Sequence, residues 1–293
     1  MLAVGSNDPL VLRQVGGPAR LHRNKARLDR GQEEEMRVWK PRALKPGQVL
    51  HWQIGPLKIW IRRTQDELHL AKERAVEDEE TLVVGEAATE SEEKLEWDRW
   101  VVGEADRAVQ FVPVMPDRPV IVRPESDFII PAGGEAAFFV SIPVWIRISI
   151  VGQRPVTLRE VPTVVLSKSW FGGPASGELC YALKTKARRS LETLPIRPHR
   201  VICPVRNFAR EELDFKRLCL HVEHLKIFGS KTHLWTNQVE VTYRGEEQLA
   251  QIDFADAAPA ISDAKELISE SRLPAVKGIL RKSFSSLKAF SGI

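Results

Sequence analysis

The sequence predicts a mainly β protein, because apolar side chains recur on every second position through most of its central part. Between residues 138 and 150 one face is wholly apolar, formed by Phe138, Val140, Ile142, Val144, Ile146, Ile148 and Ile150. A period of two over that length is typical of an extended strand, and residues 140–148 are expected to form the centre of a first core. Weaker alternation recurs from about residue 50 to 254. No helix-length amphipathic segment intervenes there, which favours sandwich-like antiparallel units over alternating strands and helices.

The strands are expected in a regular order along the chain. Alternation over 57–61, a polar turn at 64–67 and apolar residues at 68 and 70 predict a first hairpin. Further strands are expected at 107–114, 118–123, 127–130, 136–150, 161–167, 178–186, 200–206, 213–228, 237–244 and 248–254. The Pro-containing segment 194–200 is the expected boundary between two sandwich-like units, 45–195 and 196–255.

Both ends of the chain and one internal segment differ from this pattern. Residues 1–44 are polar and basic without periodicity and are expected to form an irregular arm. Segment 73–98 holds eleven acidic residues against two basic ones, so mutual repulsion favours a solvated loop. Residues 256–293 are expected to form a helical tail, with one helix at 261–272 and a second after Pro274.

The second predicted helix is amphipathic and basic. At 100° per residue its apolar side chains share one arc, and they are Val276, Ile279, Leu280, Phe284, Leu287 and Phe290. Its basic side chains lie outside that arc and are Lys277, Arg281, Lys282 and Lys288. The favoured interpretation is docking on the β body, and an anionic membrane surface or a partner groove are the alternatives.

Composition indicates a soluble globular protein, with 43% hydrophobic and 28% charged residues. The net charge of +4 and the pI near 9.0 combine opposing basic and acidic blocks, so nucleic acid is disfavoured as a partner. No apolar run reaches about 18 residues and the N-terminus lacks a basic leader. A cytoplasmic protein is expected, with association at the inner face of the membrane as the alternative.

Three cysteines, Cys180, Cys203 and Cys219, are widely spaced and form no CxxC. This argues against a disulfide framework or a zinc finger and favours reduced, buried thiols without a metal. The metal alternative uses Cys219, His221 and Glu223, which share one face of the predicted strand 213–228. Such a pair at i and i+2 can chelate zinc if another strand supplies a third ligand, but a half-buried strand with polar residues outward is the favoured interpretation.

No catalytic or cofactor motif is present: the sequence has no GxSxG, no Walker loop and no GxGxxG. No catalytic residue and no cofactor is therefore assigned. Four basic residues follow the strand predicted at 178–186 and could contact an anion or a partner; they are Lys184, Lys186, Arg188 and Arg189.

Several phrases resemble an uncharacterised prokaryotic family called domain of unknown function 432. They are GPLKIWIRR (55–63), DRPVIVRPES (117–126), IPVWIRI (142–148), WFGGPASGELCYAL (170–183), ICPV (202–205), LDFKRLCLHVEHL (213–225) and LWTNQVEVTYRGEEQLAQIDF (234–254). The family has no established activity, so the resemblance transfers no catalytic residue. It implies a gene neighbourhood with small mechanosensitive channels, and hence a membrane-linked context.

The sequence thus favours a non-enzymatic binding or accessory protein that acts through its sheet surfaces and its basic tail. Its expected partner is an unidentified protein or a second copy of the chain. The first alternative is a peripheral membrane-associated accessory protein linked to a mechanosensitive channel. The second is a metal-dependent enzyme or hydrolase.

Overall fold

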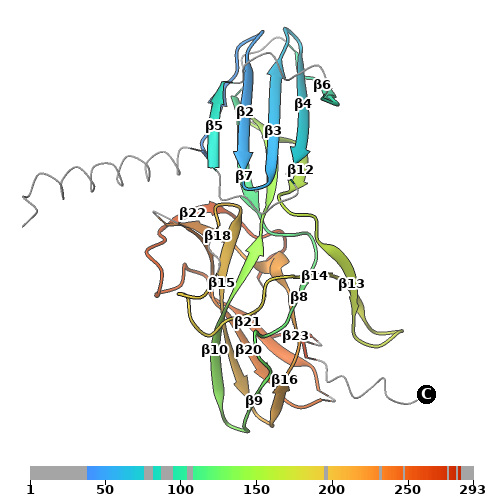
Figure 1. Ribbon diagram of the computed structural model, residues 1–293, viewed down its shortest axis with the longest axis vertical. Coiled ribbons are helices and arrows are strands. Elements are labelled where there is room, and N and C mark those ends of the chain that lie inside the picture. Colours follow the sequence, from blue (N-terminus) through green and yellow to red (C-terminus); the bar gives the residue numbers. More distant parts are fainter. Residues whose placement is uncertain are drawn as a thin grey trace, which may run out of the picture.

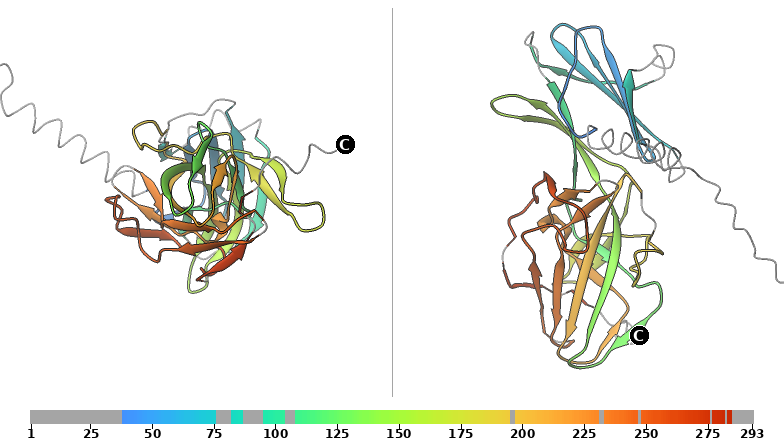
Figure 2. Two further views of the ribbon diagram at one scale, coloured as in Figure 1. Left: turned by 90° about the horizontal axis from the view of Figure 1, so that it is seen from below. Right: turned by 90° about the vertical axis from the view of Figure 1, so that its left-hand side faces the viewer.

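The computed structural model describes residues 38–75, 82–86, 95–103, 108–194, 197–230, 233–246, 248–275, 277–281 and 283–284, with the backbone alone for 82–86. Strands dominate this part of the chain, and its 3₁₀ turn η2 is short (Val222–His224). The protein is therefore mainly β, as the alternation predicted. Two bodies lie end to end along the longest axis (Figures 1 and 2).

The upper body comprises the described residues within 38–114 and 145–162 and holds two sheets. The first has the order β5-β2-β3-β4-β6, with β2 Val49–Ile54, β3 Leu57–Arg63, β4 Glu67–Arg74, β5 Leu82–Glu86 and β6 Asp98–Val101. The second has the order β1-β7-β11-β12, with β1 Arg42–Ala43, β7 Ala108–Val114, β11 Trp145–Val151 and β12 Val156–Pro162. Trp52 of β2 stacks on Phe111 of β7 with ring centroids 3.9 Å apart, so the apolar faces of the two sheets meet.

The lower body comprises the described residues within 120–143 and 167–284. Its largest sheet has the order β22-β18-β19-β15-β20-β21-β23, and β10 pairs with β15 beside that path. These strands are β10 Glu135–Pro143, β15 Arg200–Ala209, β18 Ile227–Gly229, β19 Leu234–Thr236, β20 Val239–Tyr243, β21 Ala250–Phe254, β22 Glu266–Ser269 and β23 Ile279–Arg281. A four-stranded sheet has the order β13-β14-β8-β17, with β8 Val120–Val122, β13 Ser167–Phe171, β14 Glu178–Ala182 and β17 Leu218–Leu220. A small sheet pairs β9 Phe128–Ile130 with β16 Leu213–Phe215.

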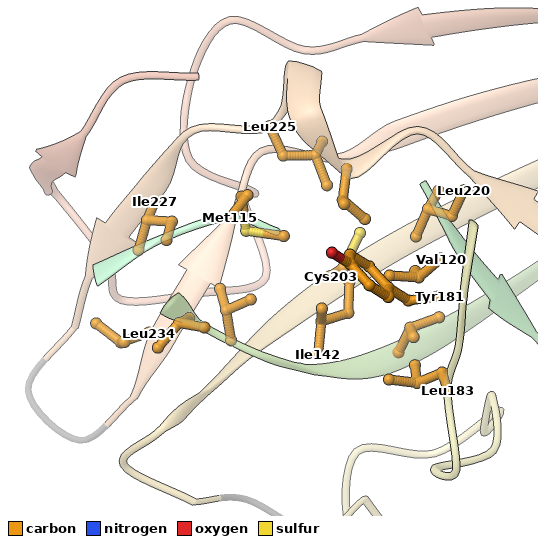
Figure 3. Packing of buried hydrophobic residues seen from close by; sticks show 14 of the residues in the cluster. Met115, Val120, Ile142, Tyr181, Leu183, Cys203, Leu220, Leu225, Ile227 and Leu234 are labelled. Atoms are coloured by element: carbon orange, nitrogen blue, oxygen red, sulfur yellow. The ribbon is translucent and has the colours of Figure 1, made fainter. Parts of the chain in front are cut away.

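Apolar side chains from the sheets of the lower body meet in its interior (Figure 3). Cys203 of β15 lies there among side chains such as Ile142, Tyr181 and Leu220. The alternating residues of 138–150 are all buried, which confirms that this stretch is central to the core.

The stretch 136–150 is nevertheless two strands and not the single strand predicted. β10 ends at Pro143 and pairs with β15, whereas β11 begins at Trp145 and pairs with β7 and β12. Between them, the Val144 N–H donates to the carbonyl of His199 at 3.0 Å. Pro143 has no N–H to continue the ladder, but the chain stays extended. The period of two therefore continues through the change of sheet.

Strand pairing crosses the boundary predicted at 194–200, because β10 and β15 are antiparallel neighbours along their whole lengths. The predicted units 45–195 and 196–255 thus share one sheet, and the division of the chain there stays a prediction. The acidic segment 73–98 is not one continuous loop, since β5 within it pairs with β2. Within the predicted arm 1–44, residues 42–43 form β1 and pair with β7, and residues 1–37 lie outside the described residues.

The prediction of a helical tail is wrong wherever the structure describes residues 256–293. Within the helix predicted at 261–272, β22 pairs with β18. Within the second predicted helix, residues 279–281 form β23 and pair with β21. Open sheet edges offer unpaired N–H and C=O groups, and the tail satisfies them in preference to its own helical periodicity.

Other parts of the second helix fall outside the described residues, namely Val276, Lys282, Leu287, Lys288 and Phe290. Phe284, from the predicted apolar stripe, packs edge-on against Phe215 and Tyr243 and so does contact the β body. Among the residues that the structure describes, no helix has the length and apolar character needed to cross a membrane.

Arg272 joins the two bodies. Its guanidinium forms an ion pair with Glu160 of β12 at 2.6 Å and donates from Nε to the Met115 carbonyl at 2.6 Å. It also lies over the ring of Trp145, 5.5 Å from the centroid. Arg147 of β11 donates to the other oxygen of Glu160 at 2.7 Å. One carboxylate thus holds two arginines at the junction.

The Glu160 carboxylate should make stability depend on pH. Burial alone would raise its pKa, but the hydrogen bonds and charges of Arg272 and Arg147 outweigh burial and hold the pKa below its ordinary value of 4.5. A carboxyl with a lowered folded pKa adds stability above its unfolded pKa and loses it as the pH falls through the folded pKa. The melting temperatures of wild type and Glu160→Gln should differ by a constant amount above about pH 5.5 and converge below about pH 4.5. A difference that stays constant down to pH 3 would contradict this.

Candidate functional site

The four-stranded sheet of the lower body has two chemically different faces. One face is apolar and belongs to the main core, with Val120, Val122, Tyr181, Leu218 and Leu220. The other carries a separate buried cluster of Ile121, Phe171, Cys180 and Cys219. The register of the strands explains why these residues share a face. Ile121 of β8 pairs with Cys219 of β17 on one side and with Ala182 of β14 on the other. Cys180 lies two residues before Ala182 on β14. Residues two apart on a strand share a face.

Three groups of metal-ligand type meet at one end of this second face, and the Cys180 thiol lies beside one of them. Atoms of Glu178, Cys219 and His221 all lie within 4.8 Å of one another. The Glu178 Oε1 atom is 3.5 Å from His221 Nε2 and 3.9 Å from Cys219 Sγ. Cys180 Sγ lies 3.6 Å from Cys219 Sγ. Two pairs at i and i+2, one at the start of β14 and one at the end of β17, thus present their side chains to each other.

His221 is oriented by a neighbouring carboxylate. Its Nδ1 lies 3.2 Å from Glu223 Oε1, while its Nε2 has no hydrogen-bond partner among the described residues and lies toward Glu178. Only 2% of the His221 surface is exposed, and the sulfurs of Cys180 and Cys219 are fully buried. Cys180, Cys219 and His221 are therefore withdrawn from water, whereas the Glu178 side chain stays 36% exposed.

The electrostatics of the cluster favour a neutral thiol in the absence of a cation. The pKa of Cys219 is raised by its hydrogen bond with Cys180, by burial and by the negative charges of Cys180, Glu178 and Glu223. Cys203 lies elsewhere, on β15 in the main core, where burial raises its pKa to about 12. All three cysteines are buried and free.

The prediction from the sequence included part of this cluster and lacked the rest. Cys219 and His221 do share a site, but Glu223 belongs to the 3₁₀ turn η2, which ends the predicted strand, and it touches His221 rather than the cluster centre. Glu178 and Cys180 were missed. Their i, i+2 spacing on the predicted strand 178–186 places them on one face of that strand, and this was the signal available in the sequence. The sequence does not show that β14 pairs with β8, which is what brings them close to Cys219 and His221.

The four basic residues predicted as anion contacts fall into two groups. Arg188 and Arg189 are engaged within the fold: Arg188 pairs with Glu125 at 3.2 Å and donates to the Thr193 carbonyl, and Arg189 lies over the Phe128 ring. Lys184 and Lys186 are exposed. The Leu183 N–H donates to the Ile121 carbonyl, and the Ala187 N–H donates to the Arg123 carbonyl. Residues 184–186 therefore have no counterpart on β8 and form a bulge, from which both lysines project.

Two arginines that the sequence did not single out complete this second group. Leu218 pairs with Val122 at the end of the ladder, so Arg217 and Arg123 are the next residues beyond that pair. The Arg217 guanidinium lies 5.8 Å from the centre of the Phe171 ring. Burial lowers the pKa of Arg217, and the charge of Arg123 lowers it further. Arg123, Lys184, Lys186 and Arg217 together are called the basic surface below.

The basic residues of the tail are not part of this group. Arg281 is exposed on β23, at the edge of the larger sheet, and Lys277 is exposed just before that strand. Lys282 and Lys288 lie outside the described residues. Their predicted role as anion or partner contacts stays a prediction.

Comparison with known proteins gives one match. A family model described as a protein of unknown function (DUF432) matches residues 38–288 and thus both bodies. Neither the curated proteins nor the solved structures gave a match. Since the matched segment covers most of the sequence, the chain belongs to the DUF432 family of proteins of unknown function.

Proposed function

We propose that the protein is a non-enzymatic binding protein that holds phosphate groups of its ligand on the basic surface. The observation that carries the proposal is that Arg123 and Arg217 flank the last residue pair of β8 and β17, where the charge of Arg123 acts on Arg217. Like charges on neighbouring strands repel each other, and an anion bound between them would attract both. Planar guanidinium groups match the oxygens of phosphate in pairs, so two of them favour this ligand.

The lysines extend the same surface. Lys184 and Lys186 leave the bulge next to Arg123, and within the described part of the chain none of these three side chains has an ion-pair partner. An exposed ammonium group acts as a point charge that attracts further phosphate oxygens. A ligand with several phosphate groups therefore fits better than a single carboxylate.

Peripheral membrane association is the second candidate, because Trp170 and Leu179 are exposed cross-strand neighbours on the β13–β14 hairpin. Exposed aromatic and basic side chains together are typical of proteins that lie on anionic membranes. However, Trp170 and Leu179 alternate with Phe171 and Cys180 and so belong to the opposite sheet face from the basic surface. A flat bilayer would not contact both faces at once, which favours a phosphate ligand free in solution.

Calorimetric titration with inorganic pyrophosphate at constant ionic strength tests the proposal. Arg123→Ala and Arg217→Ala should each weaken binding about tenfold, since a hydrogen bond to a charged group contributes about 1.5–3 kcal/mol. Lys168→Ala is the matched control, because Lys168 is exposed on the opposite face of the same sheet and should change affinity less than about twofold.

Vesicles containing phosphatidylglycerol form the second arm of the test. Binding to vesicles without binding to pyrophosphate would support membrane association instead. No binding to either, or equal losses in Lys168→Ala and Arg123→Ala, would overturn the proposal.

A further inference from the structure

Three distances among Glu178, Cys180, Cys219 and His221 are close to the edges of a zinc tetrahedron. With Zn–S near 2.3 Å and Zn–N and Zn–O near 2.0–2.1 Å, a tetrahedral site has an S···S edge of about 3.8 Å and an N···O edge of about 3.3 Å. The corresponding distances here are 3.6 Å between the two sulfurs and 3.5 Å between His221 Nε2 and Glu178 Oε1. The S···O distance from Cys219 to Glu178 is 3.9 Å, against about 3.5 Å for the ideal edge.

A second observation points to a ligand at the same place. His221 is 98% buried, yet its Nε2 has no hydrogen-bond partner in the described part of the chain and faces the other donors. A buried polar atom without a partner is costly, and a metal ion would satisfy it. The opposite ring nitrogen already contacts Glu223, and a carboxylate behind the ring is the usual support for a metal-bound histidine.

We infer that Glu178, Cys219 and His221 form a binding site for Zn²⁺, with the adjacent Cys180 thiol as the group that turns toward the ion when it binds. Thiolate and imidazole donors select zinc among the abundant divalent cations, whereas magnesium and calcium prefer oxygen ligands alone. The sequence shows only a C-x-H pair, and the fold supplies the E-x-C pair that completes it. This inference stands independently of phosphate binding, because it uses no residue of the basic surface.

A disulfide is a poorer account of the adjacent sulfurs. Cys180 and Cys219 belong to β14 and β17, which lie on either side of β8. Their sulfurs are 3.6 Å apart, against about 2.05 Å in a disulfide, and the intervening strand resists drawing the two edges together. A metal ion spans this gap, since it adds two metal–sulfur bonds between the side chains.

The site would act as a structural clamp. Its ligands come from residues 178–180 and 219–221, so the ion would tie the β13–β14 hairpin to the far edge of the sheet. The near-complete burial of Cys180, Cys219 and His221 leaves little room for a substrate, which favours a structural zinc site over a catalytic one.

Metal titration of the full chain tests this inference. After chelation under reducing conditions, the protein should bind about one equivalent of Zn²⁺, with a rise in melting temperature on the order of 5 °C. Co²⁺ in place of zinc should give the intense visible bands of a tetrahedral site together with thiolate charge-transfer absorption. Cys219→Ser and His221→Ala should weaken binding at least about 100-fold, and Glu223→Gln about 10–100-fold.

Cys203→Ser is the matched control, because Cys203 is equally buried but lies in the main core, and it should leave metal affinity unchanged. If Cys219→Ser fails to fold, Glu178→Gln replaces it, since the Glu178 side chain is 36% exposed and its loss disturbs packing little. Failure of the wild type to bind Zn²⁺, or equal affinity of the wild type and the ligand variants, would overturn the inference. Loss of pyrophosphate binding in Arg123→Ala with zinc affinity intact would separate this site from the basic surface.

Discussion

Replacing Val144 with Asp is expected to prevent folding. Val144 is fully buried where the chain passes from the lower body to the upper, and its carbonyl accepts hydrogen bonds from Thr163 N–H at 3.1 Å and Thr163 Oγ1 at 2.6 Å. The substitution leaves these backbone bonds available but puts a carboxylate into the core without a partner. An unpaired buried charge costs several kcal/mol, a large part of a total stability of about 5–15 kcal/mol.

Circular dichroism and thermal melting measure this effect. Val156→Asp is the control: it makes the same chemical change in β12, where the valine is 50% exposed, and should alter stability by less than about 0.5 kcal/mol. A Val144→Asp protein that melts at the wild-type temperature would refute the placement of this residue in the core.

Arg272→Ala should destabilise the protein by about 3 kcal/mol. The guanidinium is mostly buried, and its removal leaves Glu160 with Arg147 alone and the Met115 carbonyl without its donor. Breaking a buried ion pair by removing one partner costs about 3–5 kcal/mol, because the remaining charge stays desolvated, and the lower end applies where a second cation remains.

Urea unfolding of a double-mutant cycle tests the origin of this effect. Glu160→Gln with Arg272→Ala should cost less than the sum of the two single changes, since both remove the same interaction. Arg154→Ala, at an exposed arginine, is the control for loss of a positive charge. Additive costs would show that Arg272 acts through packing on Trp145 and not through Glu160.

The period of two predicted most strands because it reflects which side chains a sheet buries. It carries no information about which of several sheets the strand joins. The stretch from Phe138 to Ile150 keeps its alternation while passing between bodies, since both sheets bury the same set of side chains. In the tail, spacing alone favoured a helix, whereas β23 and β22 found open edges on β21 and β18. Those edges are tertiary features, and no local window of sequence contains them.

The candidate sites show the same limit. Cys219 and His221 are two residues apart, so strand geometry alone placed them together. Their partners on β14 arrive through β8, which neighbours both strands and is distant in sequence from each. Likewise Arg123 and Arg217 become a pair only through the register of β8 with β17, and neither stands out among 43 Lys and Arg residues.

The passage of the chain between the two bodies has a consequence for synthesis on the ribosome. The chain builds β1 to β7 above, leaves to form β8 to β10 below, returns for β11 and β12, and leaves again. The apolar strand β10 therefore emerges about 60 residues before β15, its main partner, which at about 5–20 residues per second is a delay of several seconds. During that interval a nascent chain carries an uncovered strand edge, and its vulnerability to misassembly is set by translation speed rather than by the stability of the finished fold.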